Sequence, residues 1–197
     1  MLVLKLNDWR VQALRRTHPR LVHAKTLARG TFGAVFTTPN PDRVLKLTVD
    51  KSHRDYLVDG LSPEGVYKPI VTEDFNEVGE TTEGDTLYLF EMERLQHLKR
   101  GTRNGLLAHR ITRYVDSHGR CPSEPVKDWG LTPDLLNFMS SLNKFADNFC
   151  YRRDFHWKNF MERPSDGTLV FSDPVFDQEM HLRKLTIHSN RARRFMH

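Results

Sequence analysis

Three polar residues near the C-terminal end constrain this chain most: Asp154, Asn159 and Asp173. The asparagine follows the first aspartate by five positions, and the second aspartate comes after a hairpin-like stretch. In phosphoryl-transfer sites this order combines a carboxylate that orients the acceptor hydroxyl with two oxygen ligands for magnesium. The rest of the chain should therefore supply a nucleotide site.

Composition limits the classes of protein to which the chain can belong. Its 197 residues suffice for one substantial core or two small lobes that share a cleft. A formal charge of +5 favours acidic partners such as nucleotide phosphates, acidic proteins or nucleic acid. Cys121 and Cys150 lack metal-site spacing, which favours a reducing cytosolic setting over a disulfide framework. Asp8 and Arg10 interrupt the apolar N-terminal run, so we expect neither export nor a membrane span.

The N-terminal half predicts a short helix followed by an antiparallel sheet. Residues 7–16 form an amphipathic pattern with Trp9, Ala13 and Leu14 on the apolar side. Five strand-like runs follow, at residues 21–27, 33–37, 43–48, 66–71 and 86–92. The acidic segment 73–85 is expected to be the exposed connection between the last two strands.

The turn after the first strand carries Gly30 and Gly33, and glycines let a backbone approach phosphate oxygens. Lys46 lies in the third strand-like run, where a lysine can reach the α- and β-phosphates. Taken alone, an ordinary hairpin turn and a solvent-facing lysine explain these two signals more simply. Their order along the chain, ahead of Asp154, favours the nucleotide interpretation.

A short helix over residues 50–60 should carry the acid that pairs with Lys46. The candidates are Asp55, Asp59 and Glu64, and the pattern does not choose among them because glycine and proline shorten the segment.

The clearest helix begins at Thr132, where a capping hydroxyl, a proline and an acid follow in order, and its apolar residues recur at helical spacing to Phe149. It should be a buried helix that leads into Asp154. Segment 117–133 before it predicts a loop. Further upstream, residues 96–115 contain five Lys or Arg and no acid, which indicates a solvated helical face or a docking surface for an acidic partner.

Three short blocks carry a family resemblance: Gly30–Phe36 with Pro41–Lys46, Asp154–Met161, and Ser172–Val175. Together they resemble the early serine/threonine protein kinase of Autographiviridae-type bacteriophages, over about residues 20–177. The resemblance implies transfer of the ATP γ-phosphate to host bacterial proteins, including RNA polymerase or RNA-processing enzymes, in the host cytoplasm.

The fold that the resemblance implies is α+β, a reduced two-lobed protein-kinase-like domain. An antiparallel five-stranded N-lobe sheet would occupy residues 1–95, and a small helical C-lobe with a basic tail would occupy residues 96–197.

The resemblance also implies the site. Asp154, Lys46 and His156 would be catalytic, and Asn159 and Asp173 would bind Mg²⁺. ATP would be held by Ala28, Gly30, Thr31, Phe32, Gly33, Lys46, Met92 and Glu93. Met92 would lie at the back of the adenine pocket and Glu93 at its rim.

Departures from ordinary protein kinases keep two alternatives open. His156 replaces the catalytic-loop lysine, and Pro174 and Val175 replace the Phe-Gly after the magnesium aspartate. The pattern Asp-x-His-x-x-Asn is also similar to aminoglycoside and choline phosphotransferases, which modify small molecules. A pseudokinase that binds and inhibits a host factor is the other alternative. The basic tail, residues 181–197, is expected to be an unstructured end or an arm that contacts nucleic acid or an acidic protein.

Overall fold

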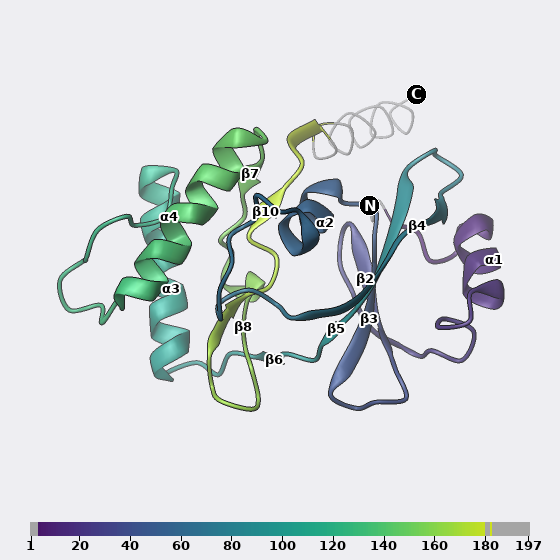
Figure 1. Ribbon diagram of the computed structural model, residues 1–197, viewed down its shortest axis with the longest axis horizontal. Helices are drawn as coiled ribbons and strands as arrows, with labels where there is room; N and C mark the ends of the chain where they lie inside the picture. Colours follow the sequence, from purple (N-terminus) through teal and green to yellow (C-terminus); the bar gives the residue numbers. More distant parts are fainter. Residues whose placement is uncertain (1–3, 180–181, 183–197) are drawn as a thin grey trace, which may run out of the picture. The chain divides into compact units, whose positions relative to one another are not determined.

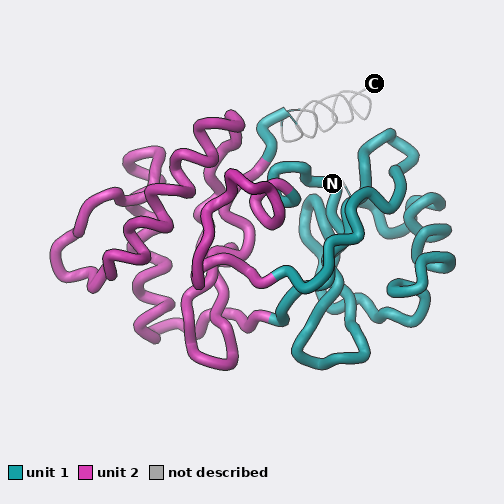
Figure 2. Tube along the Cα trace, viewed as in Figure 1, with its two compact units in different colours: residues 1–54, 71–94, 177–197 teal, residues 55–70, 95–176 magenta. Residues whose placement is uncertain are grey.

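The computed structural model describes residues 4–179 and 182 (Figure 1). Within these residues the protein is a mixed α+β structure with four α-helices and a five-stranded antiparallel sheet, which confirms the predicted fold class at that level. The chain divides into two compact units (Figure 2). The sheet unit comprises the described parts of residues 1–54, 71–94 and 177–197, and the helical unit comprises residues 55–70 and 95–176.

The sheet unit is built on five strands in the spatial order β1-β2-β3-β5-β4. The strands are β1 (Thr26–Arg29), β2 (Gly33–Thr37), β3 (Arg43–Thr48), β4 (Val71–Glu80) and β5 (Thr86–Glu93). The predicted limits of β2 and β3 are confirmed, and β5 extends one residue beyond its prediction. Alternate residues of β2, β3 and β5 are apolar and fully buried, so that one sheet face packs into the core.

Two strand predictions were wrong. Residues 66–70 are not a strand, and β4 instead occupies most of the segment predicted as an exposed connection. β4 is an edge strand that is exposed along much of its length, so its acidic residues can face water while its backbone pairs with β5. The first strand begins at Thr26, because residues 21–23 form a turn that places Leu21 in the core.

Helix α1 (Trp9–Thr17) forms close to its predicted range, with Asp8 as the N-cap. Its predicted apolar side is confirmed only in part: Leu14 packs against the core, but Trp9 is 67% exposed, and Val11 is the fully buried residue of the helix. Val11 joins a core made of N-terminal residues and one face of the sheet. The members of this core are Leu4, Leu6, Val11, Leu21, Ala34, Phe36, Leu45, Leu47, Val49, Leu87 and Leu89.

Helix α2 (Lys51–Val58) also forms where it was predicted, and its residues from Asp55 onward belong to the helical unit. The carboxylate of Asp50 accepts hydrogen bonds from the main-chain N–H groups of Ser52 and His53 at its first turn.

The helical unit contains α3 (Arg103–His118) and α4 (Pro133–Asn148). The hydroxyl of Thr132 accepts from the N–H of Leu135, which confirms the predicted start of α4. Two small sheets complete the unit, one of order β6-β8-β9 and one of order β10-β7. Their strands are β6 (Gln96–His97), β7 (Arg152–Arg153), β8 (Phe160–Glu162), β9 (Leu169–Phe171) and β10 (Val175–Phe176).

No helix in the described part of the chain is long and apolar enough to cross a membrane. Cys121 is buried and Cys150 is exposed, and both are free thiols. The predicted basic tail lies outside the described residues except for Leu182.

Candidate active site

Asp154 directly follows β7, and the segment after Asp173 forms β10. These strands pair antiparallel, with Arg153 opposite Val175. The N–H of Asp154 extends the pairing by donating to the carbonyl of Pro174 at 2.8 Å. Asp154 and Asp173 therefore lie at the same end of this two-stranded ladder, although they are far apart in sequence.

Asn159 closes the loop that begins at Asp154. Its side-chain Nδ2 donates to the Asp154 carbonyl at 2.8 Å, and its main-chain N–H donates to the His156 carbonyl at 2.8 Å. The Asn159 carbonyl accepts from the N–H of Ser172 at 2.8 Å and from its hydroxyl at 2.9 Å. The structure thus brings Asp154, Asn159 and the residue before Asp173 into one hydrogen-bonded set.

His156 is exposed within this loop and caps the short 3₁₀ helix η1 (Trp157–Asn159). Its Nδ1 accepts from the N–H of Lys158 at 3.3 Å. In neutral imidazole one ring nitrogen accepts and the other carries hydrogen, so Nε2 is the hydrogen-bond donor.

The pKa of Asp154 is raised above its ordinary value. Partial burial is the largest cause, and the charge of Asp173 acts in the same direction. Hydrogen bonds from the Asn159 side chain and the His156 main chain act in the opposite direction. A carboxylate with a raised pKa accepts a proton more readily than an ordinary aspartate.

The donor set suits magnesium. The amide nitrogen of Asn159 donates to Asp154, so the amide oxygen is the atom with ligand capacity. Asp173 adds a carboxylate, and Mg²⁺ in proteins commonly takes one or two such ligands and completes its shell with water and substrate phosphates. The described residues contain no cluster of three or more His, Cys, Asp or Glu that could hold a metal by themselves.

A buried arginine that the sequence analysis missed fastens the β8–β9 hairpin. Arg163 is 7% exposed, and its guanidinium donates to the carbonyls of Val66 at 2.9 Å and Lys68 at 3.1 Å. The N–H of Phe171 donates to the carbonyl between them, that of Tyr67, at 2.8 Å. The β8–β9 hairpin therefore holds three consecutive carbonyls. Of the two proposed metal ligands, Asn159 comes directly before this hairpin and Asp173 comes two residues after it.

Tyr56 was also missed. Its side chain is completely buried, and its hydroxyl donates to the Phe171 carbonyl at 2.7 Å. Burial, together with the charge of Asp173, raises the pKa of Tyr56 well above its ordinary value, so the hydroxyl stays protonated as a donor. Only an apolar helical spacing could have suggested that Tyr56 is buried, and nothing in the sequence indicates its partner.

The predicted nucleotide residues lie in the sheet unit. Lys46 is half-buried on β3, opposite Val35 on β2 and Phe90 on β5. Met92 is buried and Glu93 is half-buried at the end of β5. Ala28 and Gly30 are exposed, and Thr31, Phe32 and Gly33 are half-buried.

The Gly-rich turn is tied to its own unit. The N–H of Gly30 donates to the Gly33 carbonyl at 2.8 Å, so it is used within the turn. The carbonyls of Thr31 and Phe32 accept from the N–H groups of Leu4 and Val49. A Cβ added to Gly33 would lie 2.9 Å from the Leu47 carbonyl oxygen, whereas one added to Gly30 would meet nothing nearer than 3.7 Å. The close approach of β3 therefore explains why position 33 is a glycine, whereas packing does not require a glycine at position 30.

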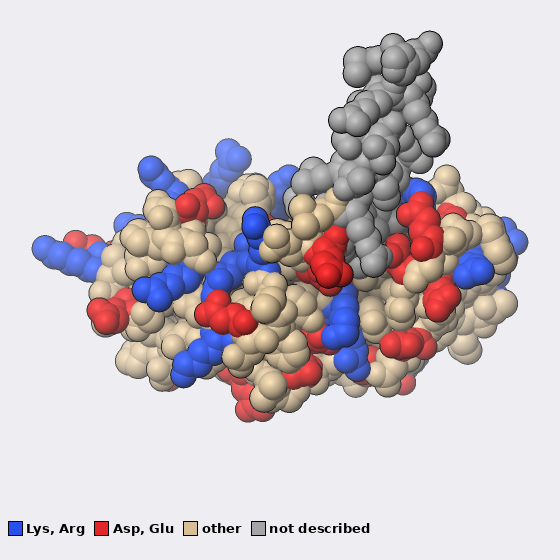
Figure 3. All heavy atoms as spheres, turned by 90° about the horizontal axis from the view of Figure 1, so that it is seen from above, with Lys and Arg blue, Asp and Glu red and all other residues tan. Residues whose placement is uncertain are grey.

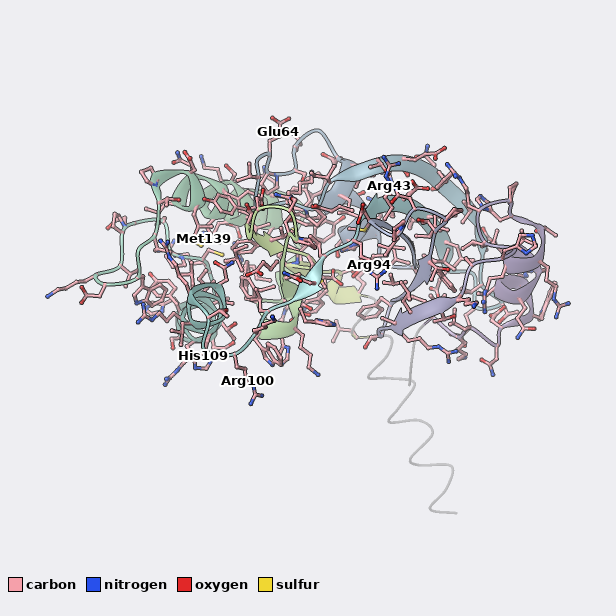
Figure 4. All side chains as sticks on the ribbon, turned by 90° about the horizontal axis from the view of Figure 1, so that it is seen from below. Arg43, Glu64, Arg94, Arg100, His109 and Met139 are labelled. Carbon is pink, nitrogen blue, oxygen red and sulfur yellow. The ribbon has the colours of Figure 1, made fainter. Side chains whose placement is uncertain are left out.

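The three acids proposed to pair with Lys46 differ in environment. Asp55 is buried and accepts from the Tyr151 hydroxyl at 2.6 Å, and Asp59 accepts from the N–H of Leu61 at 2.8 Å. Glu64 is exposed and points outward (Figure 4). All three acids belong to the helical unit and Lys46 to the sheet unit, so the ion pair stays a prediction.

Comparison with known proteins found no matching family model, no matching curated protein and no matching solved structure.

Proposed function

We propose that this protein is a serine/threonine protein kinase that uses ATP and Mg²⁺. The observation that carries the proposal is the closed loop from Asp154 to Asn159, hydrogen-bonded to Ser172 and Pro174 on either side of Asp173. It combines a carboxylate of raised pKa with two oxygen ligands suited to magnesium.

The chemistry assigned to these side chains is transfer to a hydroxyl. The acceptor oxygen forms a bond to the γ-phosphorus while the bond to the β–γ bridging oxygen breaks, and ADP leaves. Asp154 orients the acceptor hydroxyl and takes its proton. His156 donates from Nε2 to a phosphoryl oxygen. Asn159 and Asp173 would hold Mg²⁺, which would supply charge neutralisation on the phosphates of the nucleotide.

The sheet unit would supply the nucleotide half of a reduced two-lobed fold. Its Gly-rich turn connects β1 to β2, and Lys46 is on the adjacent β3 in the middle of the sheet. The resemblance to phage kinases supports host bacterial proteins in the host cytoplasm as the targets. The order of these features along the chain supports the same assignment.

Labelling of a bacterial lysate tests the proposal. The purified protein, incubated with radiolabelled ATP, Mg²⁺ and lysate, should label proteins, and Asp154→Ala should abolish the labelling. Asp166→Ala is the matched control, because Asp166 is an exposed acid at the tip of the hairpin in the same unit. This variant should label like wild type.

Other outcomes would redirect the assignment. If wild type labels nothing, including itself, the kinase proposal fails. ATP turnover that depends on an added small molecule, without protein labelling, would establish the small-molecule phosphotransferase instead. Host-factor binding and inhibition that survive in the double variant Asp154→Ala, Asp173→Ala would establish the pseudokinase.

A further inference from the structure

The basic run at residues 96–115 divides into two parts with different surroundings. Toward its C-terminal end, on α3, Arg110 donates to the Asp128 carbonyl at 2.8 Å and so helps to hold the loop before α4. At the start of the run, the guanidinium of Arg100 lies over the ring of Trp157, 5.7 Å from its centroid. Trp157 belongs to the loop between Asp154 and Asn159, so the first part of the run lies against the proposed catalytic loop.

Three cations belong to this contact or are next to it in the sequence, and we call them the loop cluster: Lys99, Arg100 and Lys158. All three are exposed, and Arg100 projects outward from the segment that leads into α3 (Figure 4). The cation–π contact with Trp157 restricts the Arg100 side chain, which stays exposed. Among the ion pairs formed between described residues, none involves these three side chains.

The carboxylate of Glu162, in the β6–β8 pairing, already has hydrogen-bond partners. Glu162 lies opposite Gln96, and its Oε1 accepts from the side-chain amide of Gln96 at 2.9 Å. Its Oε2 accepts from the side-chain amide of Asn104 at 2.9 Å. Neutral amide donors thus satisfy both oxygens, and Glu162 does not pair with the cluster cations.

Figure 3 shows Lys and Arg interspersed with Asp and Glu over the face in view, so that face has no field of a single sign. A local group of cations selects a partner with negative charge at a defined place, rather than by a field of one sign over the whole surface.

We infer that the loop cluster recognises acidic side chains flanking the acceptor serine or threonine of a protein substrate. This inference rests on the proposed kinase activity and names its substrate class. Trp157 follows Asp154 by three positions, so their Cα atoms are at most about 11 Å apart. An extended peptide with its hydroxyl at Asp154 would therefore place residues within about four positions of the acceptor beside the cluster.

The size of the preference follows from the exposure of these cations. An exposed ion pair changes an equilibrium by about two- to five-fold, and salt weakens it. Two such contacts should raise kcat/KM for an acidic peptide by about five- to twenty-fold over a neutral one. Because the contacts act on binding, the difference should appear mainly in KM.

The test uses the full chain, ATP, Mg²⁺ and three peptide sets with one central serine or threonine. The flanking four positions on each side contain Asp and Glu, Ala, or Lys. Wild type should favour the acidic set by about five- to twenty-fold over the Ala set in kcat/KM, with a smaller ratio at high salt. The double variant Arg100→Ala, Lys158→Ala should bring the kcat/KM ratio between the acidic set and the Ala set close to one. The charge-reversed pair Arg100→Glu, Lys158→Glu should prefer the Lys set.

A charge-matched control removes two exposed cations elsewhere in the same unit. Arg113→Ala on α3 together with Lys144→Ala on α4 lowers the net charge equally and should keep the acidic preference. Loss of the preference in this control would overturn the inference, since net charge alone would then explain it.

The outcomes separate the two proposals. Equal phosphorylation of all three sets overturns the substrate inference and leaves the kinase proposal standing. Phosphorylation of no peptide and no lysate protein overturns both. A binding experiment with a single-stranded RNA oligonucleotide tests nucleic acid as the alternative partner. If wild type binds the RNA, the variant Arg100→Ala, Lys158→Ala does not, and the peptides show no preference, the loop cluster binds nucleic acid and the inference is overturned.

Discussion

Tyr56 donates its buried hydroxyl to the carbonyl oxygen of Phe171 at 2.7 Å, and Phe171 lies two residues before Asp173. Tyr56→Phe would leave that carbonyl without this donor, which should cost about 1–3 kcal/mol of unfolding free energy. Because the hydrogen bond positions the chain that enters Asp173, the variant should also need more Mg²⁺ for half-maximal activity. Denaturant unfolding and a binding titration with Mn²⁺ would measure the two effects separately.

Tyr67→Phe is the matched control for this prediction. The Tyr67 hydroxyl is within hydrogen-bonding distance of the exposed Thr132 hydroxyl at 3.0 Å. Since water can replace that partner, the change should stay within about 0.5 kcal/mol. Equal effects of the two variants on metal affinity would contradict a positioning role for Tyr56.

Arg163→Lys should destabilise the helical unit although the charge is kept. A lysine ammonium cannot reproduce the rigid fork that donates to the Val66 and Lys68 carbonyls together. The loss of one hydrogen bond from a charged group should cost about 1.5–3 kcal/mol. Amide hydrogen exchange should show reduced protection at Phe171, whose N–H donates to Tyr67 between those two carbonyls. Unchanged stability and unchanged protection of the Phe171 amide would show that the hydrogen bonds of Arg163 do not stabilise the helical unit.

Gly33→Ala and Gly30→Ala should affect different properties: the first should lower stability, and the second should weaken ATP binding. A Cβ at Gly33 meets the Leu47 carbonyl oxygen at 2.9 Å, so the β2–β3 pairing must shift, at a cost of about 1–3 kcal/mol. Gly30 has room for a Cβ, so Gly30→Ala should leave stability within about 0.5 kcal/mol. If the turn approaches phosphates as proposed, Gly30→Ala should raise KM for ATP several-fold with kcat unchanged. An unchanged KM for ATP in Gly30→Ala would remove Gly30 from the nucleotide site.

Asp8 should stabilise the sheet unit in a pH-dependent way. Burial acts to raise its pKa, but hydrogen bonds from Thr82, Arg10 and Val11 outweigh burial and hold the pKa below the ordinary value of 3.8. A depressed pKa means that the contribution is complete above that value and is lost as the pH falls through the folded pKa. Asp8→Ala should therefore cost about 1–2 kcal/mol at pH 7, and the difference from wild type should shrink at about pH 3.

Urea unfolding at both pH values would check this prediction. Asp116→Ala, which removes an exposed acid from α3, should change stability by no more than about 0.5 kcal/mol at either pH. A loss for Asp8→Ala that stays the same at both pH values would assign the effect to packing rather than to the carboxylate.

Local signals predicted elements where they agreed with one another. Thr132, Pro133 and Asp134 each favour a helix start, and α4 begins there. The failure at β4 has a physical reason, because alternation of apolar and polar residues reports burial, and an edge strand that is exposed along much of its length lacks that pattern. The amphipathic pattern of α1 placed Trp9 on the apolar side, but Trp9 is exposed, and Val11, which the pattern left out, is the buried residue.

The candidate site was predictable in its residue types but not in its supports. The spacing of Asp154 and Asn159 indicates an oxygen-rich loop, and in the structure the Asn159 side chain closes that loop on the main-chain carbonyl of Asp154. Nothing in the sequence pairs Arg163 with Val66, because contacts over such separations depend on the tertiary fold. Gly33 was predicted to bind phosphate, but close packing against the Leu47 carbonyl is sufficient to explain why this position is a glycine.

The pairing of residues 66–68 with Arg163 and Phe171 has a consequence for synthesis of the chain on the ribosome. Both partners of these three carbonyls are translated roughly a hundred residues later. All five strands of the large sheet can leave the ribosome and pair while segment 55–70 still awaits its hairpin. Vectorial synthesis therefore completes the helical unit, which contains Asp154 and Asp173, after the strands of the sheet, and a nascent chain arrested before Phe171 should lack the proposed activity even with its sheet complete.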